Sequence, residues 1–255
     1  MINLVLLGDP VEHSRSPAMH RAALAAADID GTYEALLVDQ DGMARAAADL
    51  RKGLLDGANI TMPHKRTAAH LSDALAGPAQ RSGSVNTWVR SGDRIIGHST
   101  DGDGVLFAWD HAGLPAGAPV LVLGNGGAAL AALVALEGRR LYVAARRPGA
   151  AFRAAASVGV EAAEVPWGSP VSGAVIVNAT TVGMHGESLP LPVLDEASGL
   201  LDMPYAAGVT PSVEAMRAAG KPAAGGIDML IGQALASFRL WTGAEVPESV
   251  MREAL

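Results

Sequence analysis

Short apolar runs alternate along the chain with longer runs in which apolar positions recur at helical spacing. Several of the short runs are bounded by Gly or Asn, which is typical of buried parallel strands. The predicted strands are Leu4–Leu7, Ala35–Val38, Val120–Leu123 and Val175–Val177. The predicted helices are Pro17–Ala27, Gly42–Leu50, Gly126–Leu136 and Ala150–Val158. This alternation predicts an α/β fold built from layers.

A polar, glycine-rich segment, Thr100–Gly104, interrupts the pattern and marks a domain boundary. We predict an α/β domain formed by residues 1–101 and 228–255. Residues 102–227 contain G-x-G-x-x-A directly after a predicted strand and are predicted to form a Rossmann-type dinucleotide-binding domain. The late apolar run Met229–Trp241 and a short terminal helix are expected to return to the first domain.

Composition restricts the class of protein. The chain has 255 residues, of which 49% are hydrophobic and 18% charged, so it has enough apolar side chains for a large core. The net charge of −7 and the lack of Lys/Arg runs argue against a nucleic-acid partner. Apolar runs are too short for a membrane span, and the first apolar run has no basic leader. These features favour a cytoplasmic protein without a membrane partner.

Cysteine and histidine usage excludes other chemistry. The chain has no cysteine, so disulfides, thiolate metal ligands and a cysteine nucleophile are excluded. The seven histidines are scattered without a paired ligand spacing, and no metal site is expected.

A glycine turn follows the predicted strand Val120–Leu123. Gly124, Asn125, Gly126, Gly127, Ala128 and Ala129 match G-x-G-x-x-A and lead into an alanine-rich helix. In dinucleotide-binding domains the first glycine permits a tight turn, and the second lets the pyrophosphate approach the backbone. The helix N-terminus offers N–H donors to the phosphates. The alternative is a purely structural turn, but strand and helix flank this motif as a nucleotide site requires.

The next predicted strand, Leu141–Ala145, ends in Arg146 and Arg147. An NAD-binding protein usually has Asp or Glu near this point to hold the ribose 2′-hydroxyl. Guanidinium groups instead suit a 2′-phosphate. The pair therefore favours NADP over NAD, with two solvated arginines as the alternative.

Four segments of the first domain are rich in polar residues. They are Gly8–Pro17, Asn59–Lys65, Gly83–Thr87 and Gly97–Gly102. Their serines can cap a helix or bind a polar ligand, and the group as a whole suits a polyhydroxylated small molecule. Lys65 is the amine and Asp101 the acid of the set. In alcohol–ketone chemistry Lys65 can act as a base or as an electrostatic stabiliser, and the sequence leaves both open.

With these motifs the chain resembles the shikimate dehydrogenase family from Gly8 to Gly243. The opening G-x-P-x-x-H-S-x-S-P-x-x-H is present, as are N-x-T-x-P-x-K, V-N-T and T-D-x-x-G. The resemblance implies catalytic roles for Lys65 and Asp101. It also implies substrate contacts from Ser14, Ser16, Asn59, Thr61, Asn86, Tyr205 and Gln233.

The second half extends the resemblance. It is carried by the glycine turn, by Asn178–Met184, by Asp202–Tyr205 and by Gly226–Gln233. The implied cofactor contacts come from Gly124–Ala128, Arg146, Arg147, Thr180, Met203, Gly226 and Met229. The implied reaction is the reversible reduction of 3-dehydroshikimate to shikimate by NADPH, in aromatic amino-acid biosynthesis. Five positions depart from the family pattern, namely Arg21, Ser99, Ala145, Arg147 and Ala207.

Two alternatives stay open at the level of sequence. Family members that act on quinate or aminoshikimate share the Lys and Asp pair, so this pair does not select the substrate. A ligand-binding paralogue without catalysis needs neither residue, and both are present here. The sequence also leaves open whether the protein is a monomer or a homodimer.

Overall fold

A computed structural model describes residues 1–205 and 208–255. The chain divides into two compact units, Met1–Thr100 with Gln233–Leu255, and Asp101–Gly232. The sequence predicted boundaries after residues 101 and 227, whereas the units of the structure divide after residues 100 and 232. Each unit contains one six-stranded sheet and is described by itself.

The first unit has a mixed sheet with strand order β2-β1-β3-β5-β6-β4. The strands are β1 (Ile2–Gly8), β2 (Gly31–Leu37), β3 (Gly57–Ile60), β4 (Ala74–Leu75), β5 (Thr87–Ser91) and β6 (Arg94–His98). β1 pairs in parallel with β2 and β3, whereas β5 is antiparallel to both β3 and β6. The sequence analysis did not predict the β5–β6 hairpin, whose turn contains Gly92 at φ 65°.

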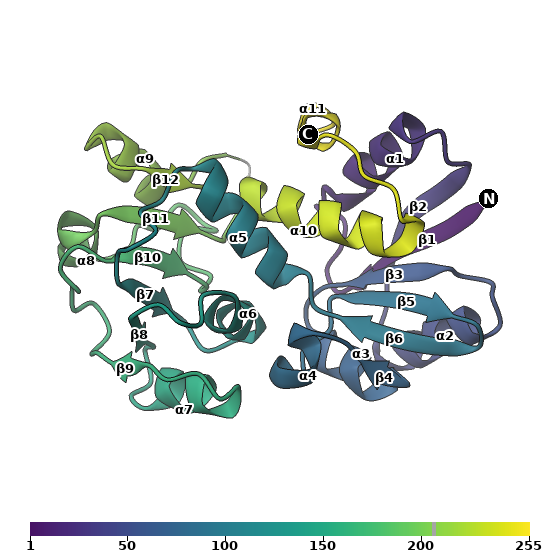
Figure 1. The fold of residues 1–255 in the computed structure, drawn as a ribbon, viewed down its shortest axis with the longest axis horizontal. Helices are drawn as coiled ribbons and strands as arrows, with labels where there is room; N and C mark the ends of the chain where they lie inside the picture. Colours follow the sequence, from purple (N-terminus) through teal and green to yellow (C-terminus); the bar gives the residue numbers. More distant parts are fainter. Residues whose placement is uncertain (206–207) are drawn as a thin grey trace. The chain divides into compact units, whose positions relative to one another are not determined.

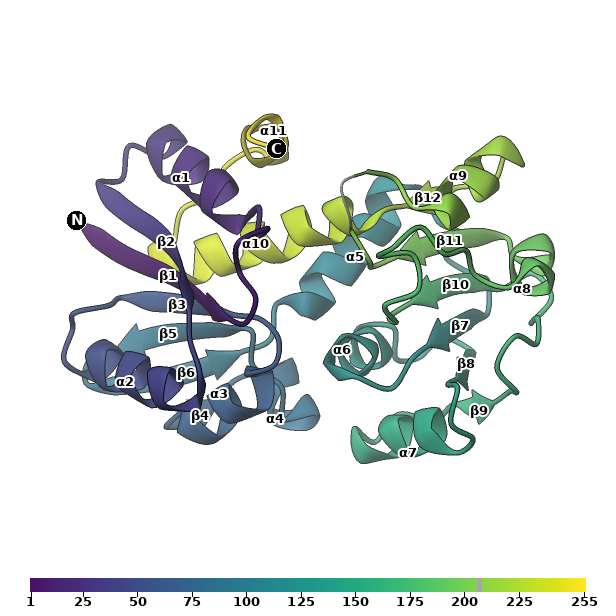
Figure 2. The same cartoon turned by 180° about the vertical axis from the view of Figure 1, so that it is seen from behind.

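Helices cover both faces of this sheet (Figures 1 and 2). They are α1 (Ser16–Ala26), α2 (Gln40–Arg51), α3 (Lys65–Leu71), α4 (Pro78–Ser82), the part of α10 (Gly226–Thr242) from Gln233 on, and α11 (Glu248–Glu253). Val5 and Leu7 pack with α2 and α3, whereas Leu4 and Leu6 pack toward Tyr33 and Trp241 of α10. Consecutive residues of β1 are therefore buried on opposite faces, which explains its unbroken apolar run. α11 packs against α1.

One strand differs from its prediction. The run Ala35–Val38 was expected to be a buried parallel strand, but β2 is an edge strand of the sheet. Its side chains Leu36 and Leu37 are 38% and 59% exposed. The physical reason is that only one neighbour, β1, pairs with β2, so this strand is less enclosed than a central one.

The second unit has a wholly parallel sheet with strand order β12-β11-β10-β7-β8-β9. The strands are β7 (Val120–Leu123), β8 (Leu141–Ala144), β9 (Ala163–Glu164), β10 (Val175–Asn178), β11 (Gly199–Asp202) and β12 (Ala223–Ala224). Numbered within this unit, the order is 6-5-4-1-2-3, which is that of Rossmann-type domains. The order reverses between β7 and β10, and ligands of such sheets bind at the carboxyl ends of the strands there.

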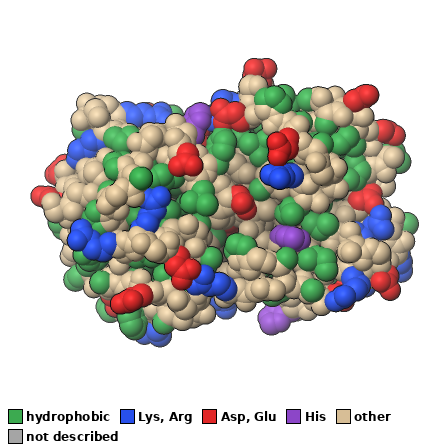
Figure 3. Space-filling view, in the orientation of Figure 1, with side chains coloured by type: hydrophobic (Ala, Val, Ile, Leu, Met, Phe, Trp, Pro, Cys, Tyr) green, Lys and Arg blue, Asp and Glu red, His purple; other side chains and the backbone are tan. Residues whose placement is uncertain are grey.

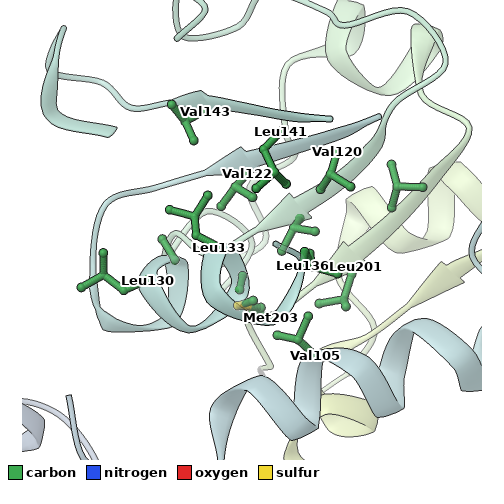
Figure 4. Packing of buried hydrophobic residues seen from close by; sticks show 14 of the residues in the cluster. Val105, Val120, Val122, Leu130, Leu133, Leu136, Leu141, Val143, Leu201 and Met203 are labelled. Carbon is green, nitrogen blue, oxygen red and sulfur yellow. The ribbon is translucent and has the colours of Figure 1, made fainter. Parts of the chain in front are cut away.

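Two apolar clusters hold this sheet between helices. The helices are α5 (Asp101–His111), α6 (Gly127–Ala135), α7 (Ala150–Ser157), α8 (Leu191–Glu196), α9 (Pro211–Ala218) and the start of α10. In Figure 4, Val120 and Val122 point toward Leu133 of α6 and Val105 of α5. The opposite face packs on α8 and α9. The predicted α/β class, with a Rossmann-type domain and C-terminal helices that join the first unit, is confirmed.

The surface and the helices bear on the expected partners. On the face that Figure 3 draws, Lys and Arg side chains are scattered among acidic and apolar ones. Among the described residues, no helix is long and apolar enough to cross a membrane.

Candidate active site

The loop after β1 carries the two predicted serines. Ser16 begins α1 and is buried, and Ser14 is half-buried. The N-cap of α1 is Arg15, which makes no side-chain capping bond. Ser14 Oγ accepts a hydrogen bond from the Ser16 N–H at 3.3 Å. The simple N-cap alternative for the serines is therefore absent, and Ser14 supports the first turn of the helix locally.

Asn59, near the end of β3, lies in a buried polar network. The Tyr33 hydroxyl donates to Asn59 Oδ1 at 2.7 Å. Asn59 Nδ2 lies 3.1 Å from both Thr87 Oγ1 and Ser237 Oγ, and 3.2 Å from the Asn86 carbonyl oxygen. Both ends of the amide are thus held by protein groups, so its direct contact with substrate stays a prediction.

Asn86 joins this network to the chain segment that precedes Asp101. Its Oδ1 accepts from the Thr100 N–H at 2.8 Å, and its Nδ2 donates to Thr100 Oγ1 at 3.0 Å. Ser237 Oγ of α10 lies 3.1 Å from Thr100 Oγ1. Sequence reasoning missed Ser237, although a serine within the apolar run Met229–Trp241 was a usable signal. These bonds fix the backbone of Thr100 within the first unit.

His20 and Tyr33 stack beside this network with ring centroids 4.4 Å apart. His20 is fully buried, and burial lowers the pKa of its imidazole to about 3 against an opposing effect of Asn59. Neither ring nitrogen has a hydrogen-bond partner among the described residues. His20 is therefore neutral near pH 7.

Lys65 is the first residue of α3 and is half-buried. It follows Thr61, whose N–H donates to the Leu7 carbonyl oxygen at 2.9 Å. The Lys65 carbonyl oxygen accepts from the Val85 N–H at 3.0 Å, which ties α3 to the segment that carries Asn86. Thr61, Lys65 and Asn86 are thus held by neighbouring parts of the first unit, and Gln233 of α10 belongs to the same unit.

Asp101 and Tyr205 belong to the second unit. Asp101 begins α5 and is 5% exposed. A carboxylate at this position interacts favourably with the positive end of the helix dipole. Tyr205 is half-buried.

Gly124 and Gly126, in the turn after β7, differ in their backbone conformation and in their surroundings. Gly124 has φ 120°, and a Cβ there would lie 2.8 Å from the Ala179 carbonyl oxygen. Gly126 has φ −88°, and a Cβ there would meet nothing within 4 Å. Gly124 is therefore required by packing, whereas Gly126 faces open space at the start of α6. That space and the N–H groups of the helix fit a phosphate group, and the exposed Asn125 lies between the two glycines.

The segments after β10 and β11 meet at the same edge of the sheet. Thr180 Oγ1 donates to Asn178 Oδ1 at 2.6 Å, and the Met203 N–H donates to the Asn178 carbonyl oxygen at 3.0 Å. A Cβ at Gly226 would collide with the carbonyl oxygens of Met203 and Pro204. Met203 and the nearby Met229 are 9% and 8% exposed. Gly127 and Ala128 begin α6 and are half-buried.

Arg146 and Arg147 follow β8 and are both exposed. Neither guanidinium forms a hydrogen bond or an ion pair with any residue that the structure describes. Two cations without a carboxylate partner suit an external anion.

As for metals, the described part of the chain holds no group of three or more candidate ligands.

Two family models match this chain. Residues 6–88 match the shikimate dehydrogenase substrate binding domain, and residues 226–255 match the shikimate 5'-dehydrogenase C-terminal domain. Both matched ranges include segments that carried the resemblance in the sequence.

Relatives match over nearly the whole chain. A protein of Anaeromyxobacter sp. (strain Fw109-5) named shikimate dehydrogenase (NADP(+)) is 40% identical over 98% of this chain and 94% of its own length. A protein of the same name from Thermus thermophilus is 36% identical, over 100% of this chain and 97% of its own length.

A solved structure agrees with these matches. The crystal structure of shikimate 5-dehydrogenase from Thermus thermophilus in complex with NADP(H) and shikimate has a TM-score of 0.92 and 35% identity, covering 100% of this chain and 98% of that one. The resemblance predicted from the sequence is thereby confirmed, and the chain belongs to the shikimate dehydrogenase family.

Proposed function

We propose that the protein is a shikimate dehydrogenase, which catalyses the reversible NADPH-dependent reduction of 3-dehydroshikimate to shikimate in aromatic amino-acid biosynthesis. The observation that carries the proposal is the match of 40% identity, over nearly full length, to a relative named shikimate dehydrogenase (NADP(+)). The cytoplasmic location favoured by the sequence remains a prediction.

On the substrate side we assign the carboxylate to Ser14 and Ser16, at the start of α1. The residues assigned to further substrate contacts are Asn59, Thr61, Tyr205 and Gln233, and Asn86 is assigned to the ring hydroxyls. The local geometry supports this for Thr61, since the hydrogen bond of its N–H group to β1 holds its backbone. The Asn86 amide, like that of Asn59, is bonded at both ends within the protein, so its assignment rests on the resemblance. Fixed polar groups orient a polyhydroxylated ligand without a large ordering cost.

For the reaction we assign Lys65 and Asp101 to the alcohol that is oxidised. Oxidation removes a hydride from the carbon and a proton from the oxygen, and the nicotinamide of NADP is the hydride acceptor. Lys65 takes the proton as a neutral amine, or stabilises charge on the oxygen as an ammonium group. Both roles of Lys65 remain open.

The residues of the second unit fit NADP. Gly126 leaves space for the pyrophosphate beside the N-terminus of α6. Arg146 and Arg147 have no protein partner within the described residues and suit the 2′-phosphate. The remaining assigned contacts come from Gly124, Asn125, Gly127, Ala128, Thr180, Met203, Gly226 and Met229. The family usually has Asn at position 145, where this chain has a buried Ala145. The polar group that this chain adds after β8, relative to the family pattern, is the arginine side chain of Arg147.

The proposal is tested by a spectrophotometric screen of shikimate, quinate and aminoshikimate, each offered with NADP and with NAD. We expect the highest kcat/KM for shikimate with NADP. A higher kcat/KM for quinate or aminoshikimate would identify a related dehydrogenase instead. Tight binding of shikimate without any turnover would identify a silent paralogue.

A further inference from the structure

Asp202 is a buried carboxylate that the catalytic assignment does not use. It is the last residue of β11 and is 0% exposed. Burial raises the pKa of Asp202, and hydrogen bonds from Thr210 and Asn178 act against this shift. A group of this kind is costly to bury unless its partners are well placed, so the groups that its two oxygen atoms hold indicate its role.

One oxygen atom of Asp202 holds Asn178 at the end of the neighbouring strand β10. Asn178 Nδ2 donates to Asp202 Oδ1 at 2.6 Å and to the Val182 carbonyl oxygen at 2.9 Å. Asn178 Oδ1 accepts from the Thr180 N–H at 3.1 Å and from Thr180 Oγ1 at 2.6 Å. The amide therefore uses all of its donors and acceptors. Because Asp202 Oδ1 accepts from the NH2 group of Asn178, the amide oxygen is left to accept from Thr180.

The other oxygen atom of Asp202 holds the chain beyond Tyr205. It accepts a hydrogen bond from Thr210 Oγ1. The same hydroxyl accepts from the Val213 N–H at 3.4 Å and thereby caps α9. The Thr210 side chain also lies against Gly183, where a Cβ would be 3.2 Å from Thr210 Cγ2. Thr210 thus contacts both the carboxylate and the loop after β10.

Two close backbone contacts connect these bonds to the proposed cofactor site. A Cβ at Gly124 of the glycine turn would lie 2.8 Å from the Ala179 carbonyl oxygen. A Cβ at Gly226 would lie 2.7 Å from the Pro204 carbonyl oxygen. A displacement of the segment after β10 or β11 would therefore be felt at the glycine turn or at the start of α10.

We propose that Asp202 is a positioning residue for the cofactor site, because its two oxygen atoms hold Asn178, which bonds Thr180, and Thr210, which caps α9, in fixed relation to the strand that leads into Met203. The inference rests on the proposed function. It adds Asp202, Asn178 and Thr210 as residues that act on NADP binding without touching NADP.

The experiment compares four variants with the wild type by isothermal titration of NADP and by steady-state kinetics with shikimate. Asp202→Asn puts an NH2 group opposite one of two donors. If it faces Thr210, the hydroxyl proton of Thr210 loses its acceptor. Thr210→Val removes the hydroxyl and nearly keeps the shape, whereas Thr210→Ser restores the hydroxyl. Ser212→Ala is the matched control, since it removes a buried hydrogen bond from the Leu189 N–H in the same unit but leaves the hydrogen bond between Thr210 and Asp202 in place.

We expect a rise of at least tenfold in the NADP Kd for Asp202→Asn and Thr210→Val, and a Kd within twofold of wild type for Thr210→Ser and Ser212→Ala. Circular dichroism at the assay temperature shows which variants are folded. If Asp202→Asn is unfolded, the NADP Kd of Thr210→Val decides the test. An NADP Kd for these two variants equal to that of Ser212→Ala would overturn the inference. Wild-type protein that neither binds NADP nor oxidises shikimate would instead overturn the proposed function.

Discussion

The two glycines of the turn after β7 allow structure and function to be separated with a single methyl group. Gly124→Ala and Gly126→Ala add the same atom two residues apart. At Gly126 the methyl meets no protein atom within 4 Å, and φ is −88°, which L-residues adopt readily. At Gly124 the methyl would lie 2.8 Å from a backbone oxygen, and φ is 120°. Gly124→Ala should therefore mainly lower the stability of the fold, and Gly126→Ala should mainly weaken NADP binding.

The magnitudes follow from these surroundings. Gly126 is the N-cap of α6, where alanine is disfavoured against glycine by several tenths of a kcal/mol or more. Replacing a glycine at a compatible φ returns about 0.4–1 kcal/mol through the unfolded state. The two effects nearly cancel, so the unfolding free energy of Gly126→Ala should stay within about 0.5 kcal/mol of wild type. Gly124→Ala should cost about 1–3 kcal/mol from backbone strain alone, before the displacement of Ala179 is counted.

The assay is urea unfolding combined with isothermal titration of NADP. Gly126→Ala should keep its stability and lose at least tenfold in NADP affinity, because the methyl fills the space that we assign to the pyrophosphate. For Gly124→Ala the main effect should be a loss of stability in urea unfolding. If Gly126→Ala binds NADP as tightly as the wild type, the cofactor does not approach the chain at this glycine, and our interpretation of the turn is refuted.

Three further predictions concern other parts of the protein. Because His20 has a folded pKa of about 3 against 6.5 in the unfolded chain, its contribution to stability is constant above pH 6.5 and is lost as the pH falls from there toward 3. The loss is about 1.4 kcal/mol per pH unit, so urea unfolding from pH 7 to 5 should show a steeper decline in wild type than in His20→Phe, and equal slopes would contradict it. Arg146→Asp should weaken NADP binding at least tenfold and NAD binding much less, as measured by Kd, and an equal loss for both would remove the 2′-phosphate assignment. Ser237→Ala removes one hydrogen-bond partner from the Asn59 amide and from each of two threonine hydroxyls. It should cost about 1–3 kcal/mol in urea unfolding and raise the shikimate KM, and an unchanged KM would show that the network does not act on the substrate side.

Local patterns were sufficient for much of the fold. The strand Val120–Leu123 was predicted with the bounds that the structure shows, because a buried parallel strand is apolar throughout and a glycine turn ends it. The run Ala35–Val38 is equally apolar, yet it forms an edge strand with Leu37 exposed. Periodicity reports the strand but not the number of its neighbours, which depends on contacts distant in sequence.

The same limit explains the functional residues that were missed. Ser237 lies 178 positions from its partner Asn59, and nothing near either residue in the sequence indicates the other. Asp202 was noticed only as the residue before Met203, because its burial and its bond to Thr210 arise from the folded chain. By contrast, the glycine turn and the arginine pair are local motifs with a direct chemical meaning, and the sequence alone was enough to single them out.

We assign Lys65 to the alcohol of shikimate, and we assign the binding of NADP to other residues of the chain. The most direct measurement is kcat for shikimate oxidation by Lys65→Ala, with the NADP Kd measured on the same preparation. We expect kcat to fall by at least two orders of magnitude and the Kd to stay within twofold of wild type. A variant that turns over shikimate at a rate comparable to wild type would show that Lys65 is not a catalytic residue.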